Sequence, residues 1–150
     1  MKQNAPIHTP FYYGWVIVAI SALSYFFSGP GQTFSNAIFI DYYIEEFGWS
    51  RSTVSGIYSA ATLLAGFLIF MVGRLFDSQG ARKMAVIISS LLGLACLFNG
   101  LIANTFMLFV GFFFIRLLGQ GSMSLTPKSL VPQWFIVKRG RALSLAALGA

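Results

Sequence analysis

Arg116 is the side chain in this sequence with the strongest claim to a chemical role. It lies inside a long apolar stretch, ten residues after Phe106. In a helix, that spacing places its guanidinium roughly 15 Å along the axis, near the middle of a bilayer. A cation at that depth costs at least about 2.5–3.5 kcal/mol, so it normally pairs with a carboxylate, a carbonyl or a ligand. Arg116 therefore predicts an anion site or a polar contact within a helix bundle.

Gln120 follows Arg116 by one helical turn and shares its face, so we expect both side chains at one site. Gly119 and Gly121 would let a neighbouring helix approach closely beside them. The apolar stretches contain no carboxylate that could pair with Arg116. The sequence is compatible with three kinds of partner for the guanidinium: a residue outside this sequence, an anionic substrate, or carbonyl groups at a helix end.

A second group of polar side chains follows the first apolar stretch. Spacings of three, four, four and three residues place them on one helical face: Ser21, Ser24, Ser28, Gln32 and Ser35. Ser28-Gly29-Pro30-Gly31 interrupts the same stretch, and proline there would free carbonyl groups from helical hydrogen bonds. Interrupted helices are tolerated at that depth where they border a cavity. We expect this face to line a substrate route; the alternative is close packing of small polar residues between helices.

The composition indicates the elements that position these residues. Hydrophobic residues make up 57% of the 150 residues and charged residues only 9%, whereas soluble domains average about 25% charged residues. Four apolar stretches are long enough to cross the membrane as helices, approximately 15–40, 52–76, 84–103 and 106–131. A fifth apolar stretch starts over 142–150. The predicted fold class is an all-α polytopic membrane protein. Ser50 or Ser52 would cap the second helix.

The positions of the charged residues predict the orientation. Cations precede the first stretch and occupy the second and fourth connections, as Lys2, Arg74, Arg82, Lys83, Lys138, Arg139 and Arg141. The first connection instead holds Asp41, Glu45, Glu46 and Arg51, and the third holds no charge. By the positive-inside rule, the N-terminus and the basic connections are cytoplasmic, in a plasma or inner membrane. Because the net charge of +6 is placed in these connections, nucleic acid is not an expected partner.

The fifth stretch is short, since 142–150 reaches only about half of the hydrocarbon thickness. We therefore expect the chain to be the N-terminal part of a helical bundle whose remaining half is missing. Enzyme chemistry is not expected, because the sequence has no phosphate-binding loop, no paired intramembrane acids and no nucleophile with a base. The single His8 and the single Cys96 predict neither a metal site nor a cofactor.

The connection from Gly73 to Lys83 reads as a short polar turn between the second and third helices. Its pattern G-x-L-x-D-x-x-G-x-R, with Gly73, Asp77, Gly80 and Arg82, resembles the signature loop of the major facilitator superfamily. Three other places resemble its monocarboxylate transporter and oxalate–formate antiporter branch: Tyr13-Gly14-Trp15, the run 47–52, and the run 134–142.

The resemblance implies two six-helix bundles, alternating access and a site between the halves. It also implies that Asp77, with Gly73, Gly80 and Arg82, gates the cytoplasmic side, and that an arginine in the fourth helix contributes to proton coupling. Two departures stand out. Ser78 replaces the arginine that usually follows the acid, and the first helix lacks the lysine that is common in the monocarboxylate branch.

These observations predict part of a secondary active transporter that moves small organic anions, with carboxylates as the expected class, by alternating access. The expected site residues are Arg116, Gln120, Ser28, Gln32 and Ser35. Its partners would be the lipid bilayer, the anion, a proton as a possible coupling ion, and the missing C-terminal half. The alternatives are a proton-coupled exporter of amphipathic compounds, or an inactive membrane fragment or scaffold subunit.

Overall fold

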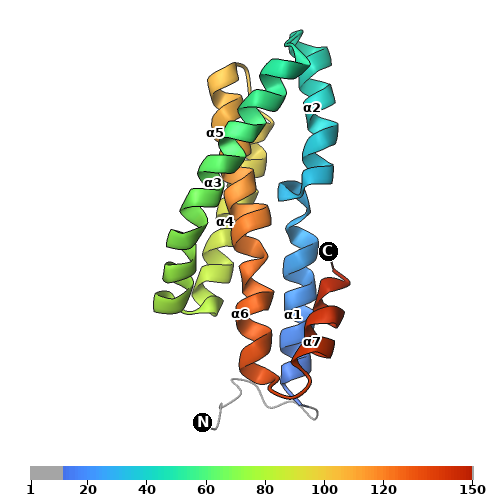
Figure 1. Cartoon of the computed structure of the whole chain (residues 1–150), viewed down its shortest axis with the longest axis vertical. Helices are drawn as coiled ribbons and strands as arrows, with labels where there is room; N and C mark the ends of the chain where they lie inside the picture. The colour runs from blue at the N-terminus through green and yellow to red at the C-terminus, as the bar shows by residue number, and fades with distance from the viewer. Residues whose placement is uncertain (1–11, 150) are drawn as a thin grey trace.

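The computed structural model describes residues 12–149, so Lys2, His8 and Ala150 lie outside the described residues. Every regular element in this part of the chain is helical (Figure 1). The elements are α1 (Gly14–Phe27), η1 (Gly29–Gly31), α2 (Thr33–Phe47), α3 (Arg51–Gln79), α4 (Ala81–Asn99), α5 (Thr105–Ile115), η2 (Arg116–Met123), α6 (Leu125–Trp134) and α7 (Arg139–Ala147). This confirms the predicted all-α class.

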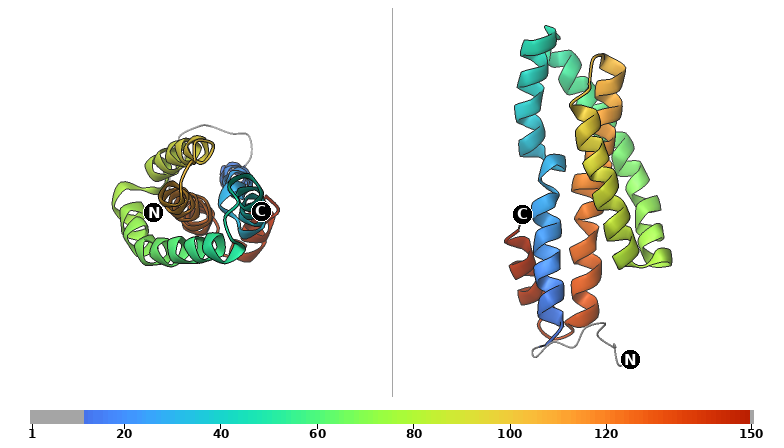
Figure 2. Two further views of the ribbon diagram at one scale, coloured as in Figure 1. Left: turned by 90° about the horizontal axis from the view of Figure 1, so that it is seen from above. Right: turned by 180° about the vertical axis from the view of Figure 1, so that it is seen from behind.

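Three helical segments of the described chain have the length and composition to cross a membrane, namely Arg51–Gln79, Ala81–Asn99 and Thr105–Trp134. Gly14–Phe27 is apolar but shorter, because the first expected crossing is divided. Its 14 residues would span only about 21 Å of the roughly 30 Å core. α2 is stacked above α1, so the two helices together form one column (Figures 1 and 2).

The interruption of this column confirms the break expected from the sequence. Ser28 ends α1, a single 3-10 turn follows over Gly29–Gly31, and α2 begins at Thr33. Pro30 cannot donate a backbone hydrogen bond, and the two glycines beside it favour helix weakly. The break therefore follows directly from the local sequence.

The fourth crossing is also irregular, which the sequence pattern did not indicate. α5 changes at Arg116 into the π-helical segment η2, which continues to Met123 before α6 begins. The Ser122 hydroxyl donates to the Leu117 carbonyl at 2.6 Å, five residues back along this wider turn. This column contacts α1, α3 and α4, so it is the centre of the described bundle (Figure 2).

The connection between α3 and α4 is tighter than the polar turn expected over Gly73–Lys83. α3 continues through Gly73 and Asp77 to Gln79, and α4 starts at Ala81. Gly80 alone joins them, with φ +84°, a backbone conformation that L side chains rarely adopt. The expectation of a longer turn was wrong because charge ends the membrane-buried stretch without ending the helix.

The outside of the bundle is strongly apolar. Phe67 and Phe70 of α3 expose 76% and 77% of their surface, and many large side chains of the other helices behave likewise. In water such a continuous apolar surface would be unfavourable, whereas in a bilayer it is the normal lipid-facing surface. Inside, three apolar clusters hold the columns together, centred on Ile88, Val131 and Phe112.

Side chains cap the helices at two of the connections, and the sequence predicted the first of these caps. Ser50 accepts a hydrogen bond from the Thr53 backbone N–H at 3.1 Å, so Ser50 and not Ser52 caps α3. Asn104 accepts from the Met107 N–H at 2.9 Å and caps α5. Both caps lie at one end of the bundle, opposite the α3–α4 and α6–α7 connections (Figure 1).

Candidate functional site

The two irregular segments, η1 and η2, are in contact where the first membrane crossing passes the fourth. A Cβ added at Gly31 would lie 2.6 Å from the Cα of Gly119, and one added at Gly119 would lie 2.7 Å from the Cα of Gly31. Only two glycines allow the backbones to approach this closely. The contact places the break of the first column directly against the π-helical segment of the fourth.

Arg116 lies at this crossing and binds the broken helix. Its Nη1 donates to the Gly31 carbonyl at 3.2 Å and to the Thr33 hydroxyl at 3.2 Å. The guanidinium carbon also lies 5.2 Å from the centre of the Tyr58 ring of α3, a cation–π distance. Of the three kinds of partner left open by the sequence, the structure contains a carbonyl at a helix break. No carboxylate of residues 12–149 forms an ion pair with Arg116.

Gln120 lines a small cavity of about 210 Å³ together with Arg116, as the shared helical face predicts. The other wall of this cavity is α3, through Thr62, Ala65, Gly66 and Ile69. Three polar residues, Arg116, Gln120 and Thr62, therefore line one space whose other lining residues are apolar or glycine. Such a donor-rich space suits an acceptor such as a carboxylate oxygen.

The polar face of the first column is divided by the break. Ser28 donates to the Tyr25 carbonyl at 2.6 Å and accepts from the Gln32 side chain at 3.0 Å, so these two predicted residues stabilise the break together. They do not line the Arg116 cavity. Ser35 lies in α2 and lines a different cavity, so the structure does not bring the five predicted residues to one place. Their shared role in a substrate route stays a prediction.

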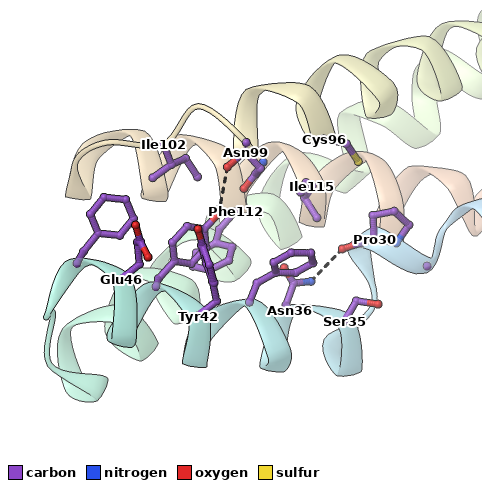
Figure 3. A pocket seen from close by; sticks show the side chains of 15 residues that line it. Pro30, Ser35, Asn36, Tyr42, Glu46, Cys96, Asn99, Ile102, Phe112 and Ile115 are labelled. Atoms are coloured by element: carbon purple, nitrogen blue, oxygen red, sulfur yellow. Dashed lines mark hydrogen bonds between the residues drawn. The ribbon is translucent and has the colours of Figure 1, made fainter.

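That second cavity, of about 690 Å³, lies between α2 and the α4–α5 region (Figure 3). The most buried polar residue in its lining is Asn36, which is 1% exposed and is not among the residues predicted from the sequence. Asn36 donates to the Gln32 carbonyl at 2.8 Å and to the Pro30 carbonyl at 3.3 Å. Asn36 follows Gln32 by one helical turn, so the spacing of the polar residues in this stretch could have identified it.

Three of the four predicted gating residues lie together at the opposite end of the bundle. Asp77, Gly80 and Arg82 border a cavity of about 590 Å³ whose other wall is α6, through Ser129, Leu130 and Gln133. Gly73 lies in α3 outside this cavity. Within residues 12–149, Asp77 has no salt bridge, and the one ion pair joins Arg51 to Asp41 at 2.6 Å. The hydroxyl of Ser78 donates to the Leu75 carbonyl of its own helix.

Comparison with family models identifies the family of this chain. The model of the Major Facilitator Superfamily matches residues 21–150, which include the broken first column, the one-residue α3–α4 connection and Arg116. The chain belongs to the major facilitator superfamily. As a member, it is an integral membrane protein, and its apolar outer surface is the surface expected to contact lipid.

Similarity to individual superfamily members points toward one branch. The chain is 27% identical to monocarboxylate transporter 9 of Mus musculus over 139 residues, which cover 92% of this chain. It is 26% identical to monocarboxylate transporter 9 of Rattus norvegicus over the same length. The alignment covers 27% of each relative, so this superfamily chain spans about a quarter of their length. No solved structure matches the chain significantly.

Proposed function

We propose that the chain forms part of a secondary active transporter that moves small organic anions, with monocarboxylates as the substrate class. The observation that carries this proposal is the cavity shared by Arg116, Gln120 and Thr62. Arg116 uses Nη1 on the Gly31 and Thr33 oxygens, and its other donors remain for a carboxylate. The similarity to monocarboxylate transporter 9 supports the same class.

Arg116 links the site to the shape of the bundle in this proposal. A carboxylate in the cavity would compete for the guanidinium that binds the Gly31 carbonyl. Because Gly31 belongs to the break between α1 and α2, a change in that contact alters how the two halves of the column meet. Substrate binding and a movement of the column are thereby coupled, as alternating access requires.

The residues around Asp77 would form the cytoplasmic gate of the carrier. Asp77 lies beside the first residues of α4, where the positive end of the helix dipole favours an acid. The cavity between this connection and α6 would leave room for Asp77 to gain a partner when the helices move. Gly80 would act as the pivot, because it is the one residue between α3 and α4.

The test is counterflow of labelled L-lactate by the complete gene product in proteoliposomes. We expect exchange in the wild-type protein, a loss of at least tenfold in Arg116→Ala, and a smaller loss in Arg116→Lys. Lysine keeps the charge but not the planar set of donors, so it replaces arginine only in part. Exchange at the wild-type rate in both variants would remove Arg116 from the mechanism.

A second candidate is a proton-coupled exporter of amphipathic compounds. The larger cavity favours it, because aromatic side chains line it, including Phe39, Tyr42 and Phe112. Exporter activity would appear as proton-driven efflux of an amphipathic dye that is insensitive to lactate. A complete carrier that exchanges lactate and leaves the dye inside would favour the first candidate.

A further inference from the structure

Two hydroxyl groups of α3 lie beside Arg116 without hydrogen-bond partners. The Tyr58 Oη and the Thr62 Oγ1 are both shielded from solvent and unbonded within the described residues. They are four residues apart, so they lie one turn apart on the same helical face. The Tyr58 ring contacts the Arg116 guanidinium, and Thr62 lines the cavity that Arg116 borders. Neither was among the residues expected from the sequence to contact substrate.

Such groups need an explanation, because buried polar atoms in native structures almost always have a partner. Several helical serines of the described bundle donate their hydroxyls to the carbonyl four residues back. Ser59 of the same helix donates to the Ser55 carbonyl at 2.9 Å, and Ser89 of α4 donates to the Ala85 carbonyl at 2.7 Å. Thr62 makes no such bond within residues 12–149, so no hydrogen bond holds its shielded hydroxyl away from the cavity that the residue lines.

The groups that share this cavity with Thr62 define what would satisfy it. The Arg116 guanidinium offers only donors, and the Gln120 amide offers two donors and an acceptor. A hydroxyl can donate its own hydrogen, so Thr62 can complete a set of donors directed at one acceptor. A carboxylate has two oxygens with about four acceptor positions, and it is the acceptor whose charge also matches Arg116.

We propose that Thr62 is a substrate-binding residue that donates a hydrogen bond to the carboxylate held by Arg116, and that Tyr58 is the positioning residue that holds the guanidinium. This inference rests on the proposed function, since it adds two residues to the same site. Thr62 acts through its hydroxyl. Tyr58 acts through the face of its ring, which attracts the cation and fixes its orientation.

Thr62→Val tests the first role, because valine keeps the shape and removes the hydroxyl. A hydrogen bond to a charged group is strong, so we expect the dissociation constant for L-lactate to rise about tenfold or more. The readout is thermal stabilisation of the complete, detergent-solubilised protein by L-lactate. Thr62→Ser should restore most of the affinity, since it returns the donor.

Thr126→Val is the matched control. Thr126 of α6 is fully buried and, like Thr62, has a hydroxyl without a partner in the described part of the chain, but it lies outside the Arg116 cavity. Removing an unsatisfied hydroxyl is neutral or stabilising. Both valine variants should therefore keep or raise the ligand-free melting temperature, and only Thr62→Val should weaken L-lactate binding. A lower melting temperature with unchanged affinity in Thr62→Val would show a structural role and overturn the proposal.

Tyr58 is tested with phenylalanine analogues of increasing ring fluorination, which weaken the negative face of the ring at nearly constant shape. Tyr58→Phe is the reference for this series, and we expect the affinity for L-lactate to fall stepwise from that reference with each added fluorine. A purely structural ring would give the same affinity throughout the series, and that result would overturn the positioning role.

Counterflow measured on the same variants separates this inference from the proposed function. Lactate binding that depends on Thr62, in a wild-type protein that does not exchange lactate, would support the site and refute the carrier. Lactate exchange with equal affinity in the wild-type protein and Thr62→Val would support the carrier and refute the role of Thr62. A wild-type protein that neither binds nor exchanges lactate would overturn both.

Discussion

At the scale of single residues, the described bundle is organised by the carbonyl groups that the break of the first column leaves without helical partners. In a bilayer, backbone groups of this kind must be satisfied within the protein. Asn36 donates a hydrogen bond to the Pro30 carbonyl, and Arg116 donates one to the Gly31 carbonyl. One of these partners comes from the next turn of the same column and the other from the fourth crossing.

Asn36→Ala should destabilise the protein, because it removes both hydrogen bonds of a fully buried amide and leaves the Pro30 carbonyl unpaired. We expect the free energy of unfolding to fall by about 1–3 kcal/mol. Unfolding by SDS titration in mixed micelles measures this loss. Ser35→Ala is the control, since Ser35 borders the same cavity without a side-chain hydrogen bond in the described structure. Equal losses in the two variants would contradict a special role for Asn36.

At the scale of the elements, the two columns that carry the site residues predicted from the sequence are also the two that are irregular. η1 and η2 pack against each other through Gly31 and Gly119, whereas α3 and α4 are uninterrupted helices. π-helical turns occur frequently at functional sites, because they redirect side chains away from the regular face. Here the π-helical segment begins at Arg116 itself. The irregular geometry and the polar chemistry therefore coincide.

Gly119→Ala should disrupt this contact. The added Cβ would lie 2.7 Å from the Gly31 Cα and 2.9 Å from the Gly31 nitrogen, and backbone atoms cannot move aside cheaply. Overpacking of this kind costs about 1–3 kcal/mol, which should appear as a lower melting temperature and slower lactate exchange.

Gly93→Ala provides the matched control on α4, where a Cβ would have no atom within 4 Å. Alanine favours helix over glycine by about 1 kcal/mol, so this variant should be neutral or more stable. Equal stability of Gly119→Ala and Gly93→Ala would show that the columns do not approach as closely as described.

At the scale of the whole molecule, the two ends of the bundle differ in the charges that they carry. The end that holds the α2–α3 and α4–α5 connections contains Asp41, Glu45, Glu46 and Arg51, and the other end contains the cations of the α3–α4 and α6–α7 connections (Figure 1). The arrangement is the one that the positive-inside rule associates with a cytoplasmic basic end. Orientation in the membrane is therefore a prediction that can be tested directly.

Single cysteines introduced into a Cys96→Ala background report this orientation. We expect a membrane-impermeant maleimide to label Ala103→Cys in intact cells, because the exposed turn before α5 would face outward. Ser78→Cys, which is exposed at the end of α3, should be labelled only after the cells are permeabilised. Labelling of Ser78→Cys and not of Ala103→Cys in intact cells would reverse the predicted topology.

The sequence alone determined the features that depend on local physics. Apolar length and scarce charge predicted membrane helices, Ser28-Gly29-Pro30-Gly31 predicted the break, and Arg116 was identified because hydrocarbon makes a buried cation costly. The turn over Gly73–Lys83 was expected to be longer, because charge reports where the chain leaves the bilayer and not where a helix ends.

Only the tertiary structure decided which groups meet. Arg116 reaches the Gly31 carbonyl across 85 residues of sequence, and Gly119 packs on the same break from the fourth crossing. Thr62 became a candidate because its hydroxyl has no partner within residues 12–149 and the residue lines the Arg116 cavity, and Tyr58 became one because its ring contacts the guanidinium. Helical periodicity assigns a residue to a face, but it does not say which helix that face contacts. That choice depends on the packing of distant segments, where close glycine contacts and unsatisfied polar groups exist only once the helices have assembled.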